Sequence, residues 1–347
     1  MLKVLNLIVP GLLGPFSDEL PQYVCEQLKQ SEFNSLRVLL SRSQIKEIIP
    51  STYFQTLQSV ICPQSDSSIC ELSAAFDQVE CSSGYLYRLD PVHFKAESDH
   101  AVLLGGHLLN IQKDEALQLI DTFNQHFVDE SIRLHFGEPG RWYLETKTPL
   151  ALSFNTIDYS LGRDIKHFMP TGDDALWWRK ILNEAQMLFF SHPVNQQRED
   201  NARLSVNGLW LWDFHFQNIE NEPNVKKIYA DDDLVKAMAS HASLSASSLV
   251  QFDNDVSAKS EFEGNISLVF DEVYDAVCYG DIDAWFEALQ SFCVNHLPGI
   301  YSLLKSNAID GINVYPCDGR KFYVDRWQLL KFWKRTSSIE NYVSKVS

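Results

Sequence analysis

The ten residues from Ser191 to Asp200, SHPVNQQRED, gather side chains that could bind an anion or direct a proton. His192 can exchange a proton near neutral pH, and Arg198 carries a planar fork of donors that matches carboxylate and phosphate groups. Asn195 can donate and accept hydrogen bonds within a turn, and Pro193 interrupts a helix. The segment therefore predicts either a structural turn or a polar pocket.

Two elements must position this segment. A helix is predicted over residues 173–191, and a strand over residues 207–212 carries Trp210 and Trp212 between leucines. Because side chains alternate along a strand, both tryptophans share one face, which could line a core or a pocket. In the structural interpretation His192 ends the helix as an imidazolium at the negative end of its dipole. The segment would then be a latch that holds its domain, an insertion predicted over residues 84–215, against strand 207–212.

The binding interpretation makes the same segment a remnant anion pocket. His192, Asn195 and Arg198 would form its rim. Arg141, Arg163 and Asn207 are the candidates to approach Arg198 across this part of the chain, because guanidinium and amide donors suit a phosphate or carboxylate ligand.

Length and charge limit the classes of function. The chain has 347 residues, with 46 acidic and 29 basic ones and a formal net charge of −17. This length favours two domains, or one domain with a large insertion. The acidic balance argues against nucleic acid and anionic membranes as partners, since both need a basic face. Seven cysteines without a C-x-x-C pair fit reduced thiols, and no apolar run is long enough to span a membrane, so we expect a cytoplasmic protein.

The pattern of apolar residues divides the chain into three parts. In residues 1–83, apolar strands at VLNLIV and SLRVLLS alternate with helices, which predicts a parallel, helix-covered sheet. Residues 84–215 predict antiparallel strands with helices among them. The first pattern returns over residues 216–347. We therefore predict an α/β core of residues 1–83 and 216–347, interrupted by an α+β insertion domain of residues 84–215.

Two further groups have the residue types of metal sites. His93, His100 and His107 recur every seven residues, but this spacing crosses predicted strands and need not bring them together. The carboxylates of 231–233 could bind a hard cation, or they could start a helix and complement its dipole. The short motifs of nucleotide-binding loops, serine hydrolases and zinc hydrolases are absent from the sequence. We predict unrelated histidines, a helix start and no metal.

The middle of the chain resembles archaeal-type cofactor-independent phosphoglycerate mutases. The residues that carry this resemblance are Leu182, Asn183, Glu184, His192, Pro193, Val194, Asn195, Arg198 and Asn207. The segments DPVH, RWYL and LGRD make it most similar to a proteobacterial branch of RpfE-type regulatory, phosphoglycerate-mutase-like proteins. The resemblance implies an alkaline-phosphatase-like α/β core with an inserted substrate domain.

Active members of that family are expected to bind two divalent metals and to use a serine nucleophile. The resemblance places the first metal-binding carboxylate where this chain has Pro10, and the nucleophile triplet is missing before Gly84. The late histidine ligands are also missing. Carboxylates remain in those places, at Asp271, Asp275, Asp281 and Asp318. Since a two-metal site tolerates few lost ligands, the resemblance implies that this chain has lost the metal centre.

We therefore expect a non-catalytic, degenerate phosphoglycerate-mutase-like protein with a regulatory or binding role and no cofactor. A phosphorylated or carboxylate small molecule would be its ligand, or a protein its partner. The predicted ligand-binding residues are His192, Asn195, Arg198, Asn207, Arg163 and Arg141. Two alternatives stay open: a metal-dependent phosphoglycerate mutase or phosphatase with rearranged ligands, and a structural interaction protein whose aromatic face meets a partner.

Overall fold

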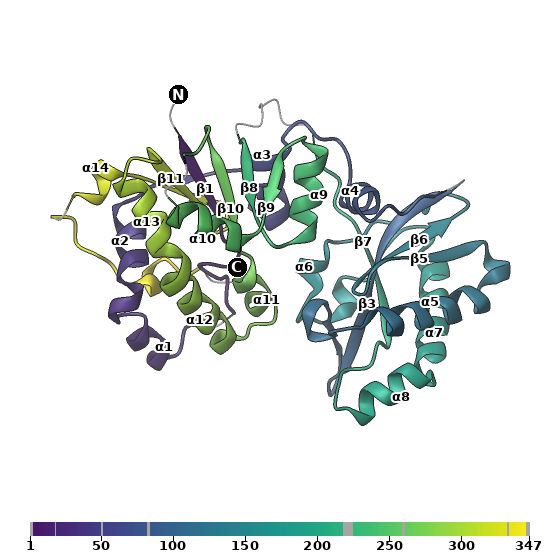
Figure 1. The fold of residues 1–347 in the computed structure, drawn as a ribbon. Coiled ribbons are helices and arrows are strands. Elements are labelled where there is room, and N and C mark those ends of the chain that lie inside the picture. The colour runs from purple at the N-terminus through teal and green to yellow at the C-terminus, as the bar shows by residue number, and fades with distance from the viewer. Residues whose placement is uncertain are drawn as a thin grey trace. The chain divides into compact units, whose positions relative to one another are not determined.

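The computed structural model describes residues 3–17, 19–49, 51–81, 84–217, 225–258, 261–331 and 333–344, except for the side chain of His107. The chain divides into two compact units. The first is Met1–Asp66 with Gln217–Ser347, and the second is Ser67–Phe216. Each unit has its own sheet with helices packed on it (Figure 1). No helix of the described residues is long and apolar enough to cross a membrane.

The first unit is built on a seven-stranded sheet with the order β2-β12-β11-β1-β10-β8-β9. Its strands are β1 (Val4–Ile8), β2 (Gln44–Glu47), β8 (Lys227–Tyr229), β9 (Ser245–Ser247), β10 (Ile266–Val269), β11 (Gly311–Tyr315) and β12 (Arg320–Asp325). Leu5 of β1 lies between Ile266 and Ile312 in parallel register. Only β12 runs against the other strands, so its pairings with β11 and with the edge strand β2 are antiparallel. The prediction that the first and last parts of the chain share one mostly parallel sheet is confirmed.

Helices of the first unit cover this sheet. They are α1 (Gln22–Gln27), α2 (Asn34–Arg42), α3 (Tyr53–Ile61), α9 (Asp233–His241), α10 (Leu249–Ser257), α11 (Glu272–Cys278), α12 (Ile282–Ser291), α13 (Leu297–Lys305) and α14 (Arg326–Leu329). The core joins Leu5 and Leu7 of β1 to Leu39 of α2, Trp285 of α12 and Ile300 of α13, all of them buried. Near-continuous burial of β1 is what a parallel strand covered by helices requires.

The segment SLRVLLS forms part of helix α2, so the strand predicted there is wrong. Leu36, Leu39 and Leu40 are buried. Their spacing of three and four residues makes one helical stripe, whereas a strand would bury alternate residues. The strand that follows, β2, is exposed along its whole length. From sequence alone, a short apolar run can be a buried helix or a buried strand, and only the pattern of burial distinguishes them.

The second unit is an antiparallel sheet with helices. Its strands are β3 (Tyr85–Ala96), β4 (Ala101–Leu104), β5 (Ile132–Glu138), β6 (Arg141–Thr146) and β7 (Gly208–Trp212), in the order β4-β3-β6-β5 with β7 also paired to β3. Its helices are α4 (Ile69–Phe76), α5 (Lys113–His126), α6 (Ile157–Ser160), α7 (Ala175–Phe190) and α8 (Pro193–Asp200). The predicted fold class, an α/β core interrupted by an α+β segment, is confirmed.

Helix α4 belongs to the second unit by its contacts. Cys70 and Ala74 of this helix pack against Tyr143 of β6. The unit therefore begins at Ser67, before residue 84, where the sequence pattern changes. The predicted domains, residues 84–215 and residues 1–83 with 216–347, stay a prediction.

Trp210 and Trp212 lie in the core of the second unit. Their side chains are buried, and the rings of Trp210 and Phe94 pack edge to face with their centroids 6.2 Å apart. The indole Nε1 of Trp212 donates to Asp90 Oδ2 at 2.8 Å, and the same carboxylate accepts two hydrogen bonds from Arg88. The aromatic face of β7 is therefore part of a core.

Candidate functional site

His192 begins a helix. It is the N-cap of α8, and its Nδ1 accepts a hydrogen bond from the Val194 N–H at 3.2 Å. Pro193 occupies the first helical position, where a missing N–H does no harm. Since Nδ1 accepts, the ring proton belongs on Nε2, which lies 3.0 Å from Thr122 Oγ1. Burial lowers the pKa of His192. The predicted imidazolium at a helix C-terminus is therefore wrong, because α7 ends at Phe190 and a positive charge at the start of α8 would oppose its dipole.

Asn195 joins three segments through its side chain, which is 1% exposed. Its Nδ2 donates to the carbonyl oxygens of Phe189 and Val206, each at 2.8 Å. Its Oδ1 accepts the Val206 N–H at 2.8 Å. The end of α7, helix α8 and the residues leading into β7 are thus tied by one amide. These contacts are the ones that the latch interpretation requires.

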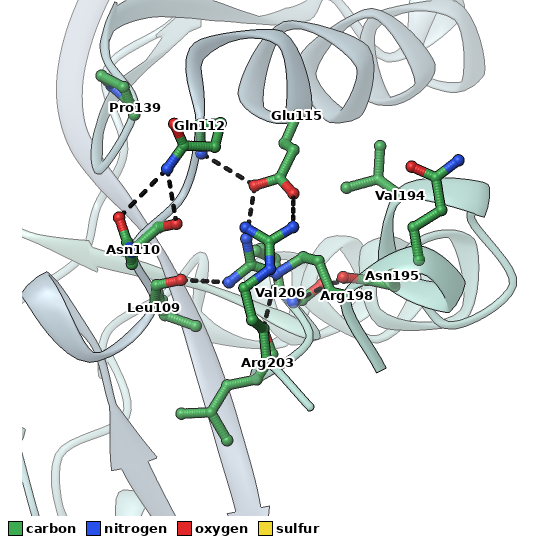
Figure 2. Close-up of polar contacts among 12 residues, drawn as sticks. Leu109, Asn110, Gln112, Glu115, Pro139, Val194, Asn195, Arg198, Arg203 and Val206 are labelled. Carbon is green, nitrogen blue, oxygen red and sulfur yellow. Dashed lines mark hydrogen bonds and ion pairs between the residues drawn. The ribbon is translucent and has the colours of Figure 1, made fainter. Parts of the chain in front are cut away.

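Arg198 is completely buried, and protein groups bind each of its nitrogen atoms. Nε donates to the Leu204 carbonyl at 2.7 Å, and Nη1 donates to Glu115 Oε2 at 2.6 Å. Nη2 donates to the Leu109 carbonyl. Figure 2 shows the Arg198 guanidinium group between Glu115 and Leu109. The donor fork that could bind an external anion is therefore directed at the protein's own oxygens.

Glu115 is the anion that this arrangement holds. Its carboxylate closes a capping box at the start of α5, where Oε2 accepts the Gln112 N–H at 2.9 Å. Arg203 donates to the other oxygen, so two guanidinium groups converge on one carboxylate (Figure 2). Burial alone would raise the pKa of Glu115, but the Gln112 N–H and the charges of Arg198 and Arg203 outweigh it and lower the pKa. This is an anion site occupied by a side chain.

The other three predicted residues have partners of their own. Arg141 binds Asp77 with two hydrogen bonds of 2.6 Å. Asn207 exchanges two hydrogen bonds with the backbone of Phe94, at 2.6 and 3.1 Å. The guanidinium group of Arg163 lies 6.0 Å from the centre of the Tyr159 ring. Their predicted approach to Arg198 is therefore not found among its hydrogen bonds, and binding of a ligand by the six residues stays a prediction.

The histidines that recur every seven residues make separate contacts where the structure describes them. His93 Nδ1 lies 2.8 Å from the Ser205 carbonyl oxygen, and His100 Nδ1 lies 2.7 Å from Asp99 Oδ1. The side chain of His107 lies outside the described residues. His93 and His100 are thus engaged with different parts of the second unit.

The carboxyl ends of the parallel strands form a second polar site in the first unit. Asp232 follows β8, Asp271 follows β10 and Cys317 follows β11. Ligands of open α/β sheets bind at this edge. Burial, with the charges of Asp232 and Asp275 beside it, raises the pKa of Asp271 to about 7. The side chain of Tyr53 is 5% exposed, and its hydroxyl has no hydrogen-bond partner among the described residues. Only the fold brings α3 to these carboxylates, so sequence reasoning missed Tyr53.

This edge does not fit the pair of divalent metals that the family resemblance implies. Pro10 follows β1 and offers no ligand atom, and Asp318 is bound by the guanidinium group of Arg320. Asp232 caps α9 by accepting the Val235 N–H at 2.8 Å, which confirms the predicted helix start. Burial raises the pKa of the Cys317 thiol and disfavours the thiolate that binds metals. Within the described ranges, no three His, Cys, Asp or Glu side chains are placed to hold a metal ion.

Comparison with curated proteins finds distant similarity to one enzyme. No family model matches the chain. The 2,3-bisphosphoglycerate-independent phosphoglycerate mutase of Methanosarcina mazei is 25% identical over 136 residues, which cover 38% of this chain and 34% of the relative. The enzyme of the same name from Methanosarcina barkeri is 24% identical over 105 residues, covering 30% and 26%. The matched stretch is thus a minor part of the length of these relatives.

Comparison with solved structures extends over the whole chain. The PH0037 protein from Pyrococcus horikoshii aligns with 100% of this chain and 99% of its own, with a TM-score of 0.53 and 12% identity. The cofactor-independent phosphoglycerate mutase from Thermoplasma acidophilum aligns with 100% of this chain and 96% of its own, with a TM-score of 0.41 and 14% identity. The likeness to the first structure shows a shared fold. The sequence matches to the Methanosarcina enzymes show a distant similarity to archaeal cofactor-independent phosphoglycerate mutases.

Proposed function

We propose that this protein is a non-catalytic relative of phosphoglycerate mutases, of the RpfE-type regulatory branch, that acts in the cytoplasm by binding a ligand or a partner. The donor set at the carboxyl edge of the first sheet carries the proposal. Pro10 stands where a carboxylate ligand is expected, and Asp318 is held by Arg320 at 2.9 Å. A metal pair lowers the pKa of a nucleophile only when its ligands hold both ions, and this edge lacks that set.

The state of Arg198 supports the same proposal. Its side chain matches a residue of the family signature, yet it is buried and bound to Glu115, Leu109 and Leu204. A phosphate group entering there would have to displace a carboxylate that two guanidinium groups and a backbone N–H hold. This residue of the signature therefore stabilises the fold here.

The test is turnover together with metal content. Protein purified without chelators should contain no stoichiometric manganese, zinc or magnesium by mass spectrometry. It should interconvert 3- and 2-phosphoglycerate no faster with added Mn²⁺ than the Asp271→Ala variant does. Turnover that is lost in Asp271→Ala but kept in Asp283→Ala, an exposed carboxylate on α12, would overturn the proposal.

A metal-dependent mutase or phosphatase with rearranged ligands is the second candidate, and one observation favours it. Asp271 shares its surroundings with Asp232 and Asp275, and the nearby Tyr53 hydroxyl is buried without a partner in the described part of the chain. A cation would relieve the repulsion among these carboxylates. In that case Mn²⁺ should raise the melting temperature of the wild type and not that of Asp271→Asn.

A ligand-binding role and a purely structural role differ in their response to small anions. The proposed ligand is a phosphorylated or carboxylate small molecule. Under a binding role, a member of a panel of phosphorylated and carboxylate metabolites should raise the melting temperature in a saturable way. No shift with the whole panel, together with capture of a protein partner by the intact chain, would favour the structural interaction protein.

A further inference from the structure

A cavity of about 430 Å³ lies among three helices of the first unit. Its walls come from α2, α13 and α14, with Tyr301 and Leu330 among the lining residues. Volumes of this size are typical of sites for small molecules, about 300–1,000 Å³. Asp325, the residue before α14, pairs with Gly311 at the start of β11. The cavity therefore lies toward the amino end of the parallel strands, away from the edge that carries Asp271.

Three cations line this cavity. Arg42 ends α2, Lys305 ends α13 and Arg326 begins α14. Two of them stand at helix C-termini, where a positive charge complements the dipole, so the helices alone could account for Arg42 and Lys305. Arg326 stands at a helix start, where the dipole opposes a cation. Helix electrostatics therefore does not explain why all three meet at one cavity.

These charges have no acidic counterpart. Among the described residues, no Asp or Glu lines the cavity and none of the three cations forms an ion pair. Arg42 Nη1 donates to the Leu329 carbonyl, while its Nε is buried without a partner in the described ranges. Arg326 donates to the amide oxygen of Asn307. In a chain with 46 acidic and 29 basic residues, three cations around one cavity without an ion pair among the described residues are an exception, and a bound anion would neutralise them.

Most of the remaining lining is apolar, with Asn34 and Ser35 as its polar members. Val38, Leu304 and Leu329 contribute to the wall beside the cations, and Leu330 is 62% exposed next to them. A small inorganic ion would leave this apolar surface in contact with water, whereas a ligand with an apolar body would cover it. The lining thus combines a cationic region with an apolar region.

We propose that this cavity binds a small amphipathic anion, with a carboxylate or phosphate head at Arg42, Lys305 and Arg326 and an apolar body against the leucines. The inference does not rest on the proposed function, because it concerns the other end of the sheet and holds for a catalytic or a non-catalytic chain. It deepens the regulatory role if that role is correct, since it names a ligand class and a site.

Displacement of a fluorescent anion tests the site in the full chain. The probe is 8-anilinonaphthalene-1-sulfonate, competed with octanoate, octyl phosphate, octan-1-ol and octylamine. Octanoate and octyl phosphate should displace the probe at concentrations about tenfold lower than octan-1-ol, since a charge-assisted hydrogen bond supplies that difference. Octylamine should not compete. The ratio of octyl phosphate to octanoate identifies the preferred head group.

Charge-removing variants locate the site. Lys305→Gln and Arg42→Gln should each weaken octanoate or octyl phosphate binding about tenfold. Arg37→Gln removes a charge from the same helix outside the cavity and should leave binding unchanged. Arg42→Gln also removes the hydrogen bond to the Leu329 carbonyl, so Lys305→Gln is the variant that tests binding without disturbing that contact. The inference would be overturned if octan-1-ol competed as well as the anions, or if Lys305→Gln bound them unchanged. It would also be overturned if the protein bound phosphatidylglycerol vesicles and neither soluble anion.

Discussion

Arg198 and Glu115 are 83 positions apart in the sequence, and the hydrogen bond from Nη1 to Oε2 joins them at 2.6 Å. The arginine side chain is fully buried and the glutamate side chain is 14% exposed. This pair fixes α8 to the start of α5, because Glu115 also caps that helix. A buried pair of this kind adds little net stability over apolar packing, but removing one partner leaves a buried charge and unpaired carbonyls.

Arg198→Ala should therefore destabilise the second unit strongly, by about 3–5 kcal/mol. The variant leaves the carbonyl oxygens of Leu109 and Leu204 without their donor and weakens the hold on Glu115. Arg203→Ala is the matched control. Arg203 donates to the same carboxylate, but its side chain is 33% exposed, so its loss should cost about 1 kcal/mol or less. Urea unfolding of both variants measures the difference, and equal costs would contradict the assignment of Arg198 as the central contact.

Asn195→Ala should cost about 1–3 kcal/mol, because buried backbone groups lose their partners. Phe189 and Val206 lose hydrogen bonds to the amide, and the Val206 N–H loses its acceptor. The exposed neighbour Gln197, changed to alanine, should leave the free energy of unfolding within about 0.5 kcal/mol of the wild type. Thermal and urea unfolding of the pair provide the measurement. A stable Asn195→Ala variant would show that the amide is not a latch.

The latch was accessible from sequence to the extent that its contacts are local. Turn chemistry predicts a bond from Asn195 to the backbone of its own turn, and the structure instead places the bonds at Phe189 and Val206, 6 and 11 positions away. Glu115 could not be chosen as the partner of Arg198, because no periodicity relates them. His192 was assigned to the wrong helix because a Pro at a helix end and a Pro at a helix start look alike in sequence until the cap is seen.

The α/β class was accessible for a different reason. Apolar strands such as β1 are buried on both faces and leave a continuous apolar run. The error at α2 shows the limit of that signal, since SLRVLLS is equally apolar but helical. The group of Tyr53 with Asp271 depends on the order of strands in the sheet, and that order is set by contacts between distant segments.

Gly208 of β7 should not tolerate a side chain. A Cβ atom there would lie 2.2 Å from the Phe94 ring, which packs on Trp210. Gly208→Ala forces that ring to move within the core, which should cost about 1–3 kcal/mol. Gly140→Ala is the control, because a Cβ there meets nothing within 4 Å. Near-ultraviolet circular dichroism reports the aromatic core, and an unchanged spectrum and stability in Gly208→Ala would contradict the packing described.

Asp271 and Asp255 should give the first unit opposite dependences on pH. Burial beside Asp232 raises the pKa of Asp271 to about 7, so its folded form binds a proton more tightly than the unfolded chain does. Hydrogen bonds from Tyr229 and Lys227 lower the pKa of Asp255 to about 2, so its folded form favours the carboxylate. The two carboxylates differ because one lies among like charges and the other has a donor and a cation beside it.

The sign of each effect follows from proton binding. The contribution of Asp271 is fully present below its unfolded pKa of 3.8 and is lost as the pH rises through about 7. The wild type should therefore lose stability between about pH 4 and pH 7, on the order of a few kcal/mol. Asp271→Asn should not show this loss. The contribution of Asp255 is present above pH 3.8 and is lost as the pH falls toward about 2. Asp255→Asn should therefore lower the free energy of unfolding at neutral pH and make it depend less on pH below about 4. Urea unfolding at intervals from pH 3 to pH 8 measures both variants, and parallel profiles for Asp271→Asn and the wild type would show that Asp271 is ionised throughout that range.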